Sequence, residues 1–373
     1  MTALIYFFME KHFVKLFSGS EFQGLIKSGT YNNFLALLKS YVQTMDIKEL
    51  QNQIFQLETE EQFNSVALDV FHFQYENNKV YRGFCDAPGI KSSNLDHYSQ
   101  IPFLPVEFFK KHKVISCRET PSLVFSSSGT TGMQTSRHFV KEPGIYRRSF
   151  TNAFELFFGD PEDYHILALL PGYMEREGSS LIYMVNELIK MSHSPHSGFY
   201  LDELDQLRSK IISLRNDDRK ILLLGVSFAL LEMAEEYPVD HPRLMIMETG
   251  GMKGRRKEII REELHDILKN AFSVESICSE YGMTELLSQA YSKGDGIFST
   301  PPWMKVLIRD MNDPFTFLES GKSGGISVID LANLHSCSFI ATQDLGKYVS
   351  LSEFQILGRF DNSDIRGCNL MAG

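Results

Sequence analysis

A loop rich in hydroxyl groups and glycines, SSSGTTG, spans residues 126–132 and follows the apolar run at residues 123–125. Glycines let the backbone approach a ligand closely, and backbone amides with serine and threonine hydroxyls donate hydrogen bonds to phosphate oxygens. The pattern indicates a phosphate-binding loop at the end of a buried strand, although it lacks the GxxxxGK[ST] spacing of a Walker P-loop. A flexible surface turn would have the same composition.

A second polar stretch, YGMTE, spans residues 281–285 after a short β-rich run. Tyr281 offers a flat ring for a purine, Thr284 offers a hydroxyl for a phosphate oxygen, and Glu285 offers a carboxylate for Mg²⁺ beside that phosphate. The same letters also fit a helix with acidic residues in its first turn. Both interpretations stand at this point.

Two further pieces also come directly after predicted strands. The stretch ETGG at residues 248–251 ends in paired glycines, which permit the close approach of a flat ligand. Asp344 in ATQDLG and Arg359 in GRFDNSDIRG supply a carboxylate and a guanidinium that could bridge a ribose diol. Isolated residues of these two types more often form a surface ion pair.

The composition narrows the class of ligand. The chain has 373 residues, of which 43% are hydrophobic, and its formal net charge is −10, so we expect a large core and no nucleic-acid partner. Its five cysteines show no CxxC spacing, which favours free thiols in a reducing, cytoplasmic compartment. Glu10 and Lys11 interrupt the N-terminal apolar run, and no apolar run is long enough to cross a membrane, so we expect neither a signal peptide nor membrane insertion.

Hydrophobic periodicity predicts the elements that position these pieces. Apolar residues at three- and four-residue spacing predict helices over residues 32–76, within a mostly helical region 1–100. Over residues 101–300, β-rich runs alternate with helical ones, which predicts parallel strands joined by crossover helices. Over residues 301–373, short strands separated by turn residues predict a β-rich subdomain with a C-terminal tail. In such sheets ligands bind beyond the carboxyl ends of the strands, where the phosphate-type loop lies.

The order and spacing of SSSGTTG, GG, YGMTE, TQDLG and GRFDNSDIRG resemble the adenylate-forming superfamily of acyl-CoA synthetases and peptide-synthetase adenylation domains. This resemblance runs from about residue 122 to the end of the sequence. Residues 101–114, 167–185 and 363–371 look like one branch, the acyl-protein synthetase of the bacterial-luminescence fatty-acid reductase complex, and that match covers most of the chain. It implies a layered, parallel-sheet α/β core of the adenylate-forming type with a helical N-terminal region and a C-terminal β-rich subdomain, but no lid domain.

The resemblance implies a two-step acyl activation that uses ATP and Mg²⁺. A fatty acid attacks the α-phosphate of ATP, pyrophosphate leaves, and a thiol then takes the acyl group from the acyl-adenylate. In this branch the thiol belongs to the protein itself, and Cys368 matches its position. Arg366 lies close enough in sequence to favour the thiolate. The expected protein partner is a fatty-acyl reductase.

The resemblance also assigns roles in ATP binding. The loop residues that it places on the phosphates are Ser127, Ser128, Gly129, Thr130, Thr131 and Gly132. The other implied roles are adenine binding by Gly250, Gly251 and Tyr281, ATP binding by Gly282, α-phosphate binding by Thr284, Mg²⁺ binding by Glu285, and ribose binding by Asp344 and Arg359.

Two departures from the family pattern concern positive charge. Met133 and Gln134 replace the usual Pro-Lys after the phosphate loop, and the lysine of the lid domain has no counterpart. Another cation would therefore stabilise the leaving pyrophosphate. The candidates are Arg137, Lys253, Arg255, Arg256 or a partner subunit. Two other functions stay open: a ligase that passes the acyl group to coenzyme A or a carrier protein, and a non-catalytic acyl-binding subunit.

Overall fold

The computed structural model describes residues 47–117, 120–127, 135–171, 178–201, 203–250, 259–350 and 352–360. The chain divides into two compact units, Met1–Gln56 and Leu57–Gly373. In the described part of the first unit, residues 47–54 are helical. All the elements discussed below belong to the second unit.

Two helices, α4 (Glu60–Asn77) and α5 (Lys79–Cys85), begin the second unit. The Thr59 side chain accepts a hydrogen bond from the amide of Gln62, and the Gln62 side-chain oxygen accepts one from the Thr59 amide, so a capping box starts α4. The side chain of Asn78 accepts two backbone amides in the first turn of α5 and caps that helix. Local polar signals therefore fix the starts of both α4 and α5.

Buried Gln74 joins α4 to a segment far along the chain. Its side-chain amide donates to the main-chain carbonyl groups of Asn333 and Leu334 at 3.1 and 3.0 Å. Its oxygen accepts from the amide of Ser338 at 2.9 Å. These bonds hold the short 3₁₀ helix η3 (Leu331–Asn333), which supplies one residue of the candidate site.

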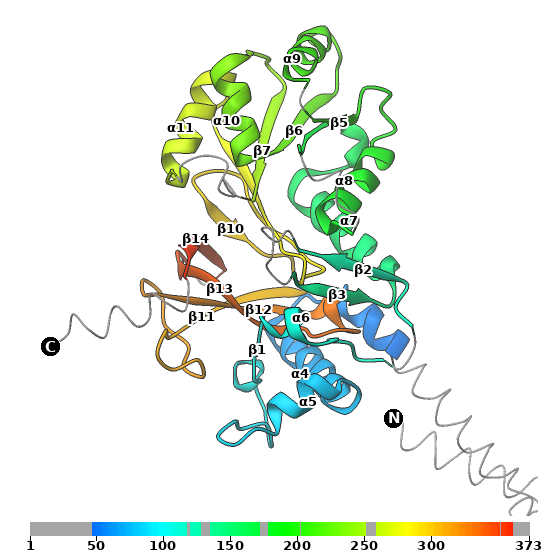
Figure 1. Cartoon of the computed structure of the whole chain (residues 1–373), viewed down its shortest axis with the longest axis vertical. Helices are drawn as coiled ribbons and strands as arrows, with labels where there is room; N and C mark the ends of the chain where they lie inside the picture. Colours follow the sequence, from blue (N-terminus) through cyan, green and yellow to red (C-terminus); the bar gives the residue numbers. More distant parts are fainter. Residues whose placement is uncertain are drawn as a thin grey trace, which may run out of the picture. The chain divides into compact units, whose positions relative to one another are not determined.

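The parallel part of the main sheet consists of buried strands between helices. Its strands run in the order β8, β7, β6, β4, β5. Their bounds are β4 (Tyr164–Leu169), β5 (Gly198–Tyr200), β6 (Lys220–Val226), β7 (Leu244–Thr249) and β8 (Ile277–Tyr281). The helices around them are α7 (Pro143–Phe158), α8 (Ser180–Met191), α9 (Leu204–Ser213), α10 (Ser227–Glu236) and α11 (Arg261–Phe272). Helix α8 packs on β4, whereas α10 and α11 cover β6, β7 and β8 from the other side (Figure 1). Apolar runs such as ILLLGV in β6 are buried because helices cover both faces.

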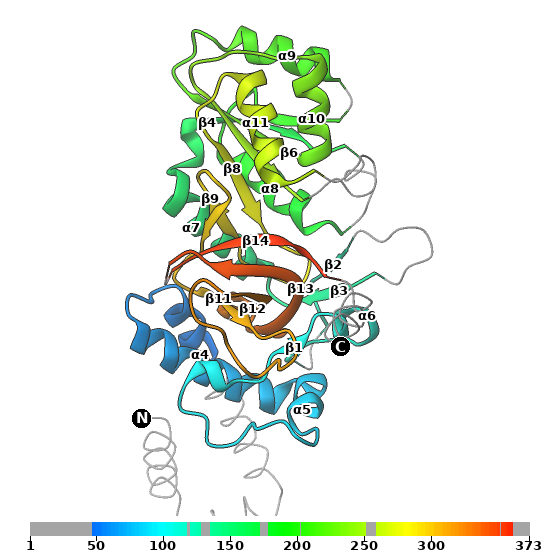
Figure 2. The same cartoon turned by 90° about the vertical axis from the view of Figure 1, so that its left-hand side faces the viewer.

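Antiparallel strands continue the same sheet beyond β8. In the described residues the order is β8, β9, β10, β14, β13, β12, β11, and β1 adds to β13 in parallel, which makes twelve strands in all. Their bounds are β1 (Leu104–Pro105), β9 (Ala290–Ser292), β10 (Ile297–Ser299), β11 (Met304–Arg309), β12 (Ser323–Asp330), β13 (Phe339–Tyr348) and β14 (Glu353–Arg359). Figure 2 shows this continuation from yellow β8 to orange and red β13 and β14. The domain boundaries at residues 100 and 300 stay predictions.

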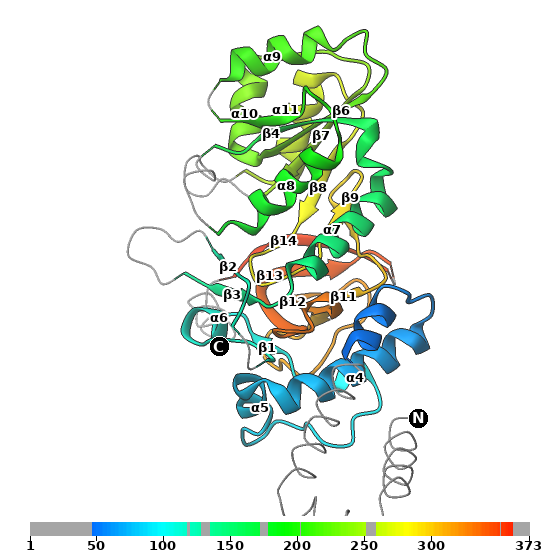
Figure 3. The same ribbon diagram turned by 90° about the vertical axis from the view of Figure 1, so that its right-hand side faces the viewer.

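A separate hairpin carries the base of the hydroxyl-rich loop. Strands β2 (Leu123–Ser126) and β3 (Arg137–Val140) pair in antiparallel register, and β3 packs beside α6 (Phe108–Lys111) (Figure 3). Short 3₁₀ helices also occur at η1 (Tyr98–Gln100) and η2 (Pro161–Asp163). The predicted layered α/β fold with parallel strands and crossover helices is confirmed. None of the helices in the described ranges combines the length and the apolar character that a bilayer-spanning segment needs.

Candidate active site

Several predicted site residues lie outside the described residues. They are Ser128, Gly129, Thr130, Thr131, Gly132, Gly251, Arg366 and Cys368, together with the candidate cations Lys253, Arg255 and Arg256. Their assignments stay predictions. The described candidates are Ser127, Arg137, Gly250, Tyr281, Gly282, Thr284, Glu285, Asp344 and Arg359.

Tyr281, Asp344 and Arg359 lie in direct contact. The Tyr281 hydroxyl donates to Asp344 Oδ2 at 2.8 Å, and Arg359 Nε lies 3.2 Å from Asp344 Oδ1. Asp344 and Arg359 face each other across β13 and β14. The Asp344 side chain is 10% exposed and that of Arg359 is 66% exposed, so this pair has one buried member and one that reaches solvent. Burial raises the pKa of Asp344, whereas the Arg359 guanidinium and the Tyr281 hydroxyl lower it.

Residues 282–288, here called the β8 turn, carry Thr284 and Glu285 directly after β8. No helix forms in this described stretch, so the alternative interpretation of a helix with acidic residues in its first turn is wrong. The reason is Asp330, whose Oδ2 accepts the amides of Leu287 at 2.7 Å and Ser288 at 2.9 Å. In a helix these amides would instead bond to carbonyl groups four residues earlier.

The carbonyl groups of the β8 turn are held from two other elements. His138 of β3 contacts the Thr284 carbonyl oxygen through Nδ1 at 2.8 Å. The side-chain amide of Asn333, in η3, donates to the Glu285 carbonyl oxygen at 2.7 Å. Asp330 Oδ1 also accepts the Ser288 hydroxyl at 2.6 Å. The turn is therefore fixed by long-range hydrogen bonds rather than by a helix.

Glu285 is a buried carboxyl whose chemistry fits a hard cation. It is 5% exposed, and burial raises its pKa, while a hydrogen bond with Ser136 lowers it. Among the described residues no lysine, arginine or histidine forms an ion pair with it, and no cluster of three or more His, Cys, Asp or Glu side chains provides a metal site. A Mg²⁺ ion at Glu285 would therefore take its other oxygen ligands from phosphate and water, as this ion often does.

The base of the hydroxyl-rich loop lies next to Glu285. The Ser127 amide donates to the Ser136 carbonyl oxygen at 3.0 Å, and the Ser136 amide donates to Ser127 Oγ at 2.9 Å. These two bonds close the hairpin on both sides of residues 128–134. Ser136 also forms a hydrogen bond with Glu285. Ser136 therefore connects the base of the loop to the predicted metal ligand. Arg137, the one candidate cation among the described residues, begins β3 beside this base.

Gly250 and Gly282 occupy positions where a side chain would be costly. Gly250 follows β7 with φ of 69°, in the left-handed region that favours glycine. A Cβ atom on Gly282 would collide with the carboxyl group of Glu280. Glu280 in turn accepts a hydrogen bond from Thr249, and burial raises its pKa to about 7. Gly282 therefore brings backbone close to Glu280 at the end of β8, whereas Gly250 gives the chain a left-handed conformation at the end of β7.

Three of the described cysteines are buried thiols. Burial raises the pKa of Cys85 to about 12 and that of Cys278 to about 11, and it raises the pKa of Cys337 as well. Such thiols are poor nucleophiles because the thiolate is the reactive form. Cys117 is partly exposed. Cys85, Cys278 and Cys337 therefore pack as small buried apolar groups.

Sequence reasoning missed the residues that hold the β8 turn, namely His138, Asn333 and Asp330. They lie 146, 48 and 42 residues from their respective partners in the chain. Local motifs report on neighbours in sequence, so none of these three could be assigned to the turn. The paired acidic and hydroxyl residues in the turn were visible because they are contiguous.

One family model matches part of the chain. Residues 42–149 match the family described as acyl-protein synthetase, LuxE. No curated protein is significantly similar to the chain in sequence.

Solved structures of ligases share the fold. 2-Hydroxyisobutyryl-CoA ligase, in an open conformation with 2-HIB-AMP and CoA, superposes with a TM-score of 0.62 at 13% identity, over 82% of this chain and 72% of that one. The same ligase in its postadenylation state gives 0.61 at 13% identity, over 82% and 70%. ATP-bound MatB from Rhodopseudomonas palustris gives 0.49 at 17% identity, over 65% and 49%.

The likeness to the CoA ligase shows that this chain has the fold of the adenylate-forming ligases. The chain spans about half the length of the MatB structures that it matches, 49% of that chain. Residues 42–149 therefore resemble a family of acyl-protein synthetases, and the fold is that of the adenylate-forming ligases.

Proposed function

We propose that the protein activates a fatty acid with ATP to an acyl-adenylate and then transfers the acyl group to its own Cys368 as a thioester, for delivery to a fatty-acyl reductase. The observation that carries the proposal is the contact among Tyr281, Asp344 and Arg359. The family resemblance assigned these residues to one nucleotide, although they come from β8, β13 and β14. A reducing, cytoplasmic setting suits the thiol chemistry.

The described residues divide the work of binding ATP. The Tyr281 ring would face the adenine, while Asp344 accepts hydrogen bonds from the ribose hydroxyls beside Arg359. Thr284 and Ser127 would donate their hydroxyls to phosphate oxygens, with Arg137 as the nearby cation for the leaving pyrophosphate. Mg²⁺ bound at Glu285 would neutralise negative charge on the phosphates.

Each of the two steps releases one leaving group, pyrophosphate in the first and AMP in the second. A carboxylate oxygen of the fatty acid attacks the α-phosphorus of ATP, the bond from that phosphorus to the bridging oxygen breaks, and pyrophosphate leaves with the electron pair. The Cys368 thiolate then attacks the acyl carbon, the bond to the AMP oxygen breaks, and AMP leaves. The raised pKa values of Cys85, Cys278 and Cys337 favour the thiol form at those sites, which leaves few alternatives to Cys368.

Intact-mass spectrometry after incubation with fatty acid, ATP and Mg²⁺ tests the whole reaction. We expect one added acyl group, which hydroxylamine removes as it does from a thioester. The Cys368→Ser variant should carry no acyl group, or should carry it only as an ester that resists hydroxylamine. Cys117→Ser is the matched control, because Cys117 is the partly exposed cysteine among the described residues, and it should load normally. A label that depends on Cys117, or that maps to another cysteine, would overturn the assignment of Cys368.

The same experiment with added coenzyme A separates the second candidate function. A solved structure with the same fold is a ligase that was crystallised with CoA, which makes a soluble thiol acceptor worth testing. If acyl-CoA forms while the protein stays unlabelled, the protein is a ligase that acts on a soluble thiol. Binding of the fatty acid with neither product would instead indicate an acyl-binding subunit.

A further inference from the structure

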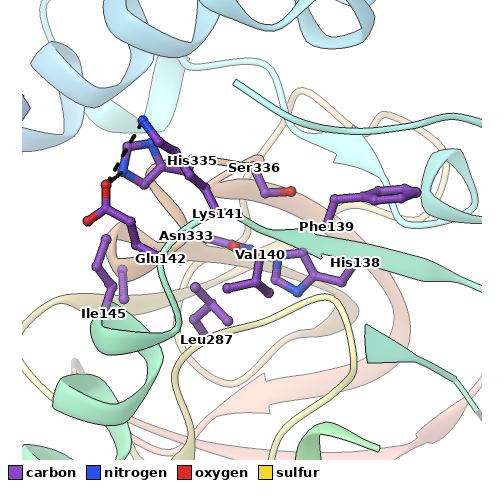
Figure 4. A pocket seen from close by; sticks show the side chains of 11 residues that line it. His138, Phe139, Val140, Lys141, Glu142, Ile145, Leu287, Asn333, His335 and Ser336 are labelled. Carbon is purple, nitrogen blue, oxygen red and sulfur yellow. Dashed lines mark ion pairs between the residues drawn. The ribbon is translucent and has the colours of Figure 1, made fainter. Parts of the chain in front are cut away.

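A small cavity lies beside the β8 turn, where His138 and Asn333 hold its carbonyl groups. Its volume is about 10 Å³, close to the space that a single water molecule needs. His138, Asn333, Val140 and Leu287 line it together (Figure 4). The lining includes residues of β3, of the β8 turn through Leu287 and of η3 through Asn333, so the cavity lies where these three elements meet.

The hydrogen bond of His138 fixes which ring nitrogen carries the proton. A carbonyl oxygen can only accept, so the 2.8 Å contact with Thr284 requires a proton on Nδ1. Burial lowers the pKa of His138 to about 4, against weaker raising effects of a backbone hydrogen bond with Thr284 and of a side-chain hydrogen bond with Asn333 that only the protonated ring could donate, so the ring is neutral at pH 7. Nε2 is then an unprotonated acceptor, and it is buried without a partner among the described residues.

The same reasoning fixes the amide of Asn333. Its nitrogen must face the Glu285 carbonyl oxygen, 2.7 Å away, which leaves Oδ1 on the other side as an acceptor. Oδ1 is also buried without a partner among the described residues. His138 Nε2 and Asn333 Oδ1 are therefore two acceptors on residues that line one cavity, and they cannot satisfy each other while the histidine is neutral.

We propose that His138 and Asn333 form a clamp that positions Thr284 and Glu285, and that one buried water completes the clamp by donating to His138 Nε2 and Asn333 Oδ1. A water molecule has two O–H donors, which matches two acceptors in a cavity of this volume. The clamp acts on the reaction through the turn and does not touch the substrate, so both side chains are positioning residues. This inference rests on the proposed function for its effect on ATP, but not for its geometry.

The clamp has a direct consequence for phosphate and metal binding. Thr284 and Glu285 each have their carbonyl group fixed by a different clamp residue, so releasing one bond frees the turn to shift. A displacement of about 1 Å at a reacting centre can lower a rate roughly 100-fold. Fatty-acid binding does not depend on these two carbonyl bonds, and we expect it to be retained.

Substitution of His138 tests the positioning role. His138→Asn retains an amide donor near the position of Nδ1, whereas His138→Phe retains the ring shape without a donor. We expect His138→Phe to raise the dissociation constant of ATP with Mg²⁺ and to lower fatty-acid-dependent pyrophosphate exchange, each by roughly 10- to 100-fold. His138→Asn should recover most of both losses. Equal behaviour of the two variants, or wild-type behaviour of His138→Phe, would overturn the clamp.

The matched control is His165, another buried histidine, which lies in β4 and bonds with Ser194 and Asp217. His165→Asn and His165→Phe should lower stability without separating from each other in ATP affinity. If they reproduce the His138 pattern, the effect belongs to general destabilisation and the positioning role fails.

The tautomer of His138 tests the geometry without ATP. Long-range ¹H–¹⁵N correlation spectra of ¹⁵N-histidine-labelled protein distinguish the two neutral tautomers, which coordinates alone leave to inference. We expect a neutral Nδ1–H ring at pH 7 whose signals vanish in His138→Asn. A protonated ring or an Nε2–H ring would overturn the clamp, even if the protein exchanges pyrophosphate. If the protein shows the expected tautomer but no pyrophosphate exchange, the result supports the clamp and contradicts only the proposed function.

Crystallographic density tests the water itself. The proposal requires a water peak within hydrogen-bonding distance of His138 Nε2 and Asn333 Oδ1 in the wild-type protein. A direct contact between the two side chains with no room for a water would overturn the bridging part of the inference.

Discussion

The β8 turn and the β13–β14 ladder hold neighbouring parts of the candidate site by different means. In the turn, buried side chains form hydrogen bonds with backbone groups. His138 and Asn333 bond with two carbonyl oxygens, and Asp330 accepts from two backbone amides. In the ladder, the regular pairing of strands brings Asp344 opposite Arg359, and the side chains meet one another. This difference shows that the backbone of a turn without regular structure depends on hydrogen bonds from side chains. In a β-ladder, the register of strand pairing is enough to place two residues opposite each other.

The comparison predicts that the turn is more fragile than the ladder. Asp330→Ala would leave the amides of Leu287 and Ser288 and the Ser288 hydroxyl buried without their acceptor. We expect a loss of about 3–5 kcal/mol in the free energy of unfolding, because each buried donor left without an acceptor costs about 1–3 kcal/mol. Denaturant unfolding measures it.

Asp313→Ala is the matched control, because Asp313 also accepts a backbone amide, but in an exposed loop. We expect it to cost less than about 1 kcal/mol. Similar costs for the two variants would contradict the claim that the turn depends on Asp330.

Glu280 lies in β8 directly before the β8 turn, and its burial predicts an effect of pH on stability. Its pKa is about 7 in the folded protein against an ordinary 4.5, because burial disfavours the charged form. The folded state therefore holds the proton more tightly, and this group costs stability progressively as pH rises from about 4.5 to about 7. Glu280→Gln should match the wild type near pH 4.5 and exceed it by about 2–3 kcal/mol in free energy of unfolding at pH 8.

Denaturant unfolding at both pH values checks this prediction. His138 titrates in the opposite sense, since its lowered pKa adds stability as pH rises from about 4 to about 6.5, and it does so equally in both proteins. The difference between wild type and variant therefore isolates Glu280. A difference that does not change with pH would contradict the assigned burial of its charge.

Substitution in the β13–β14 ladder should have a smaller effect, which falls on ATP binding rather than on fatty-acid binding. Asp344→Ala removes the buried partner of Tyr281 and Arg359, and loss of a charged hydrogen-bonding group costs about 1.5–3 kcal/mol. We expect ATP binding to weaken roughly 10- to 150-fold, while fatty-acid binding stays nearly intact. Isothermal titration calorimetry measures both ligands.

Arg359→Ala sharpens this prediction, because its side chain is 66% exposed and an exposed ion pair contributes about 1 kcal/mol or less. It should weaken ATP binding only about 5-fold or less. Equal losses for Asp344→Ala and Arg359→Ala would contradict the division into a buried and an exposed partner. Unchanged ATP affinity in Asp344→Ala would place the nucleotide elsewhere.

The sequence could predict features that lie in contiguous or periodic residues. The parallel strands were visible because apolar runs alternate with helical spacing, and the fold class is confirmed on that basis. The contact of Tyr281, Asp344 and Arg359 was implied only through family resemblance, since the three come from different strands.

The physical support of the site could not be predicted in the same way. Residues 283–290, MTELLSQA, have helix-forming letters, yet Asp330 captures the amides that a helix would use. The continuation of the sheet from β8 through β9 and β10 to β14 depends on pairing between residues about 60 apart, such as Ile297 with Gln355. Tertiary contacts of this kind override local propensity and leave no local signal.

Fatty-acid-dependent exchange of labelled pyrophosphate into ATP tests the central claim most directly, because it reports acyl-adenylate formation without the acyl acceptor. We predict exchange that requires both fatty acid and Mg²⁺, that survives Cys368→Ser, and that falls at least about 100-fold in Glu285→Ala. Exchange that continues unchanged in Glu285→Ala would contradict the metal assignment. No exchange by folded wild-type protein that binds ATP and fatty acid would contradict the claim that this site makes an acyl-adenylate.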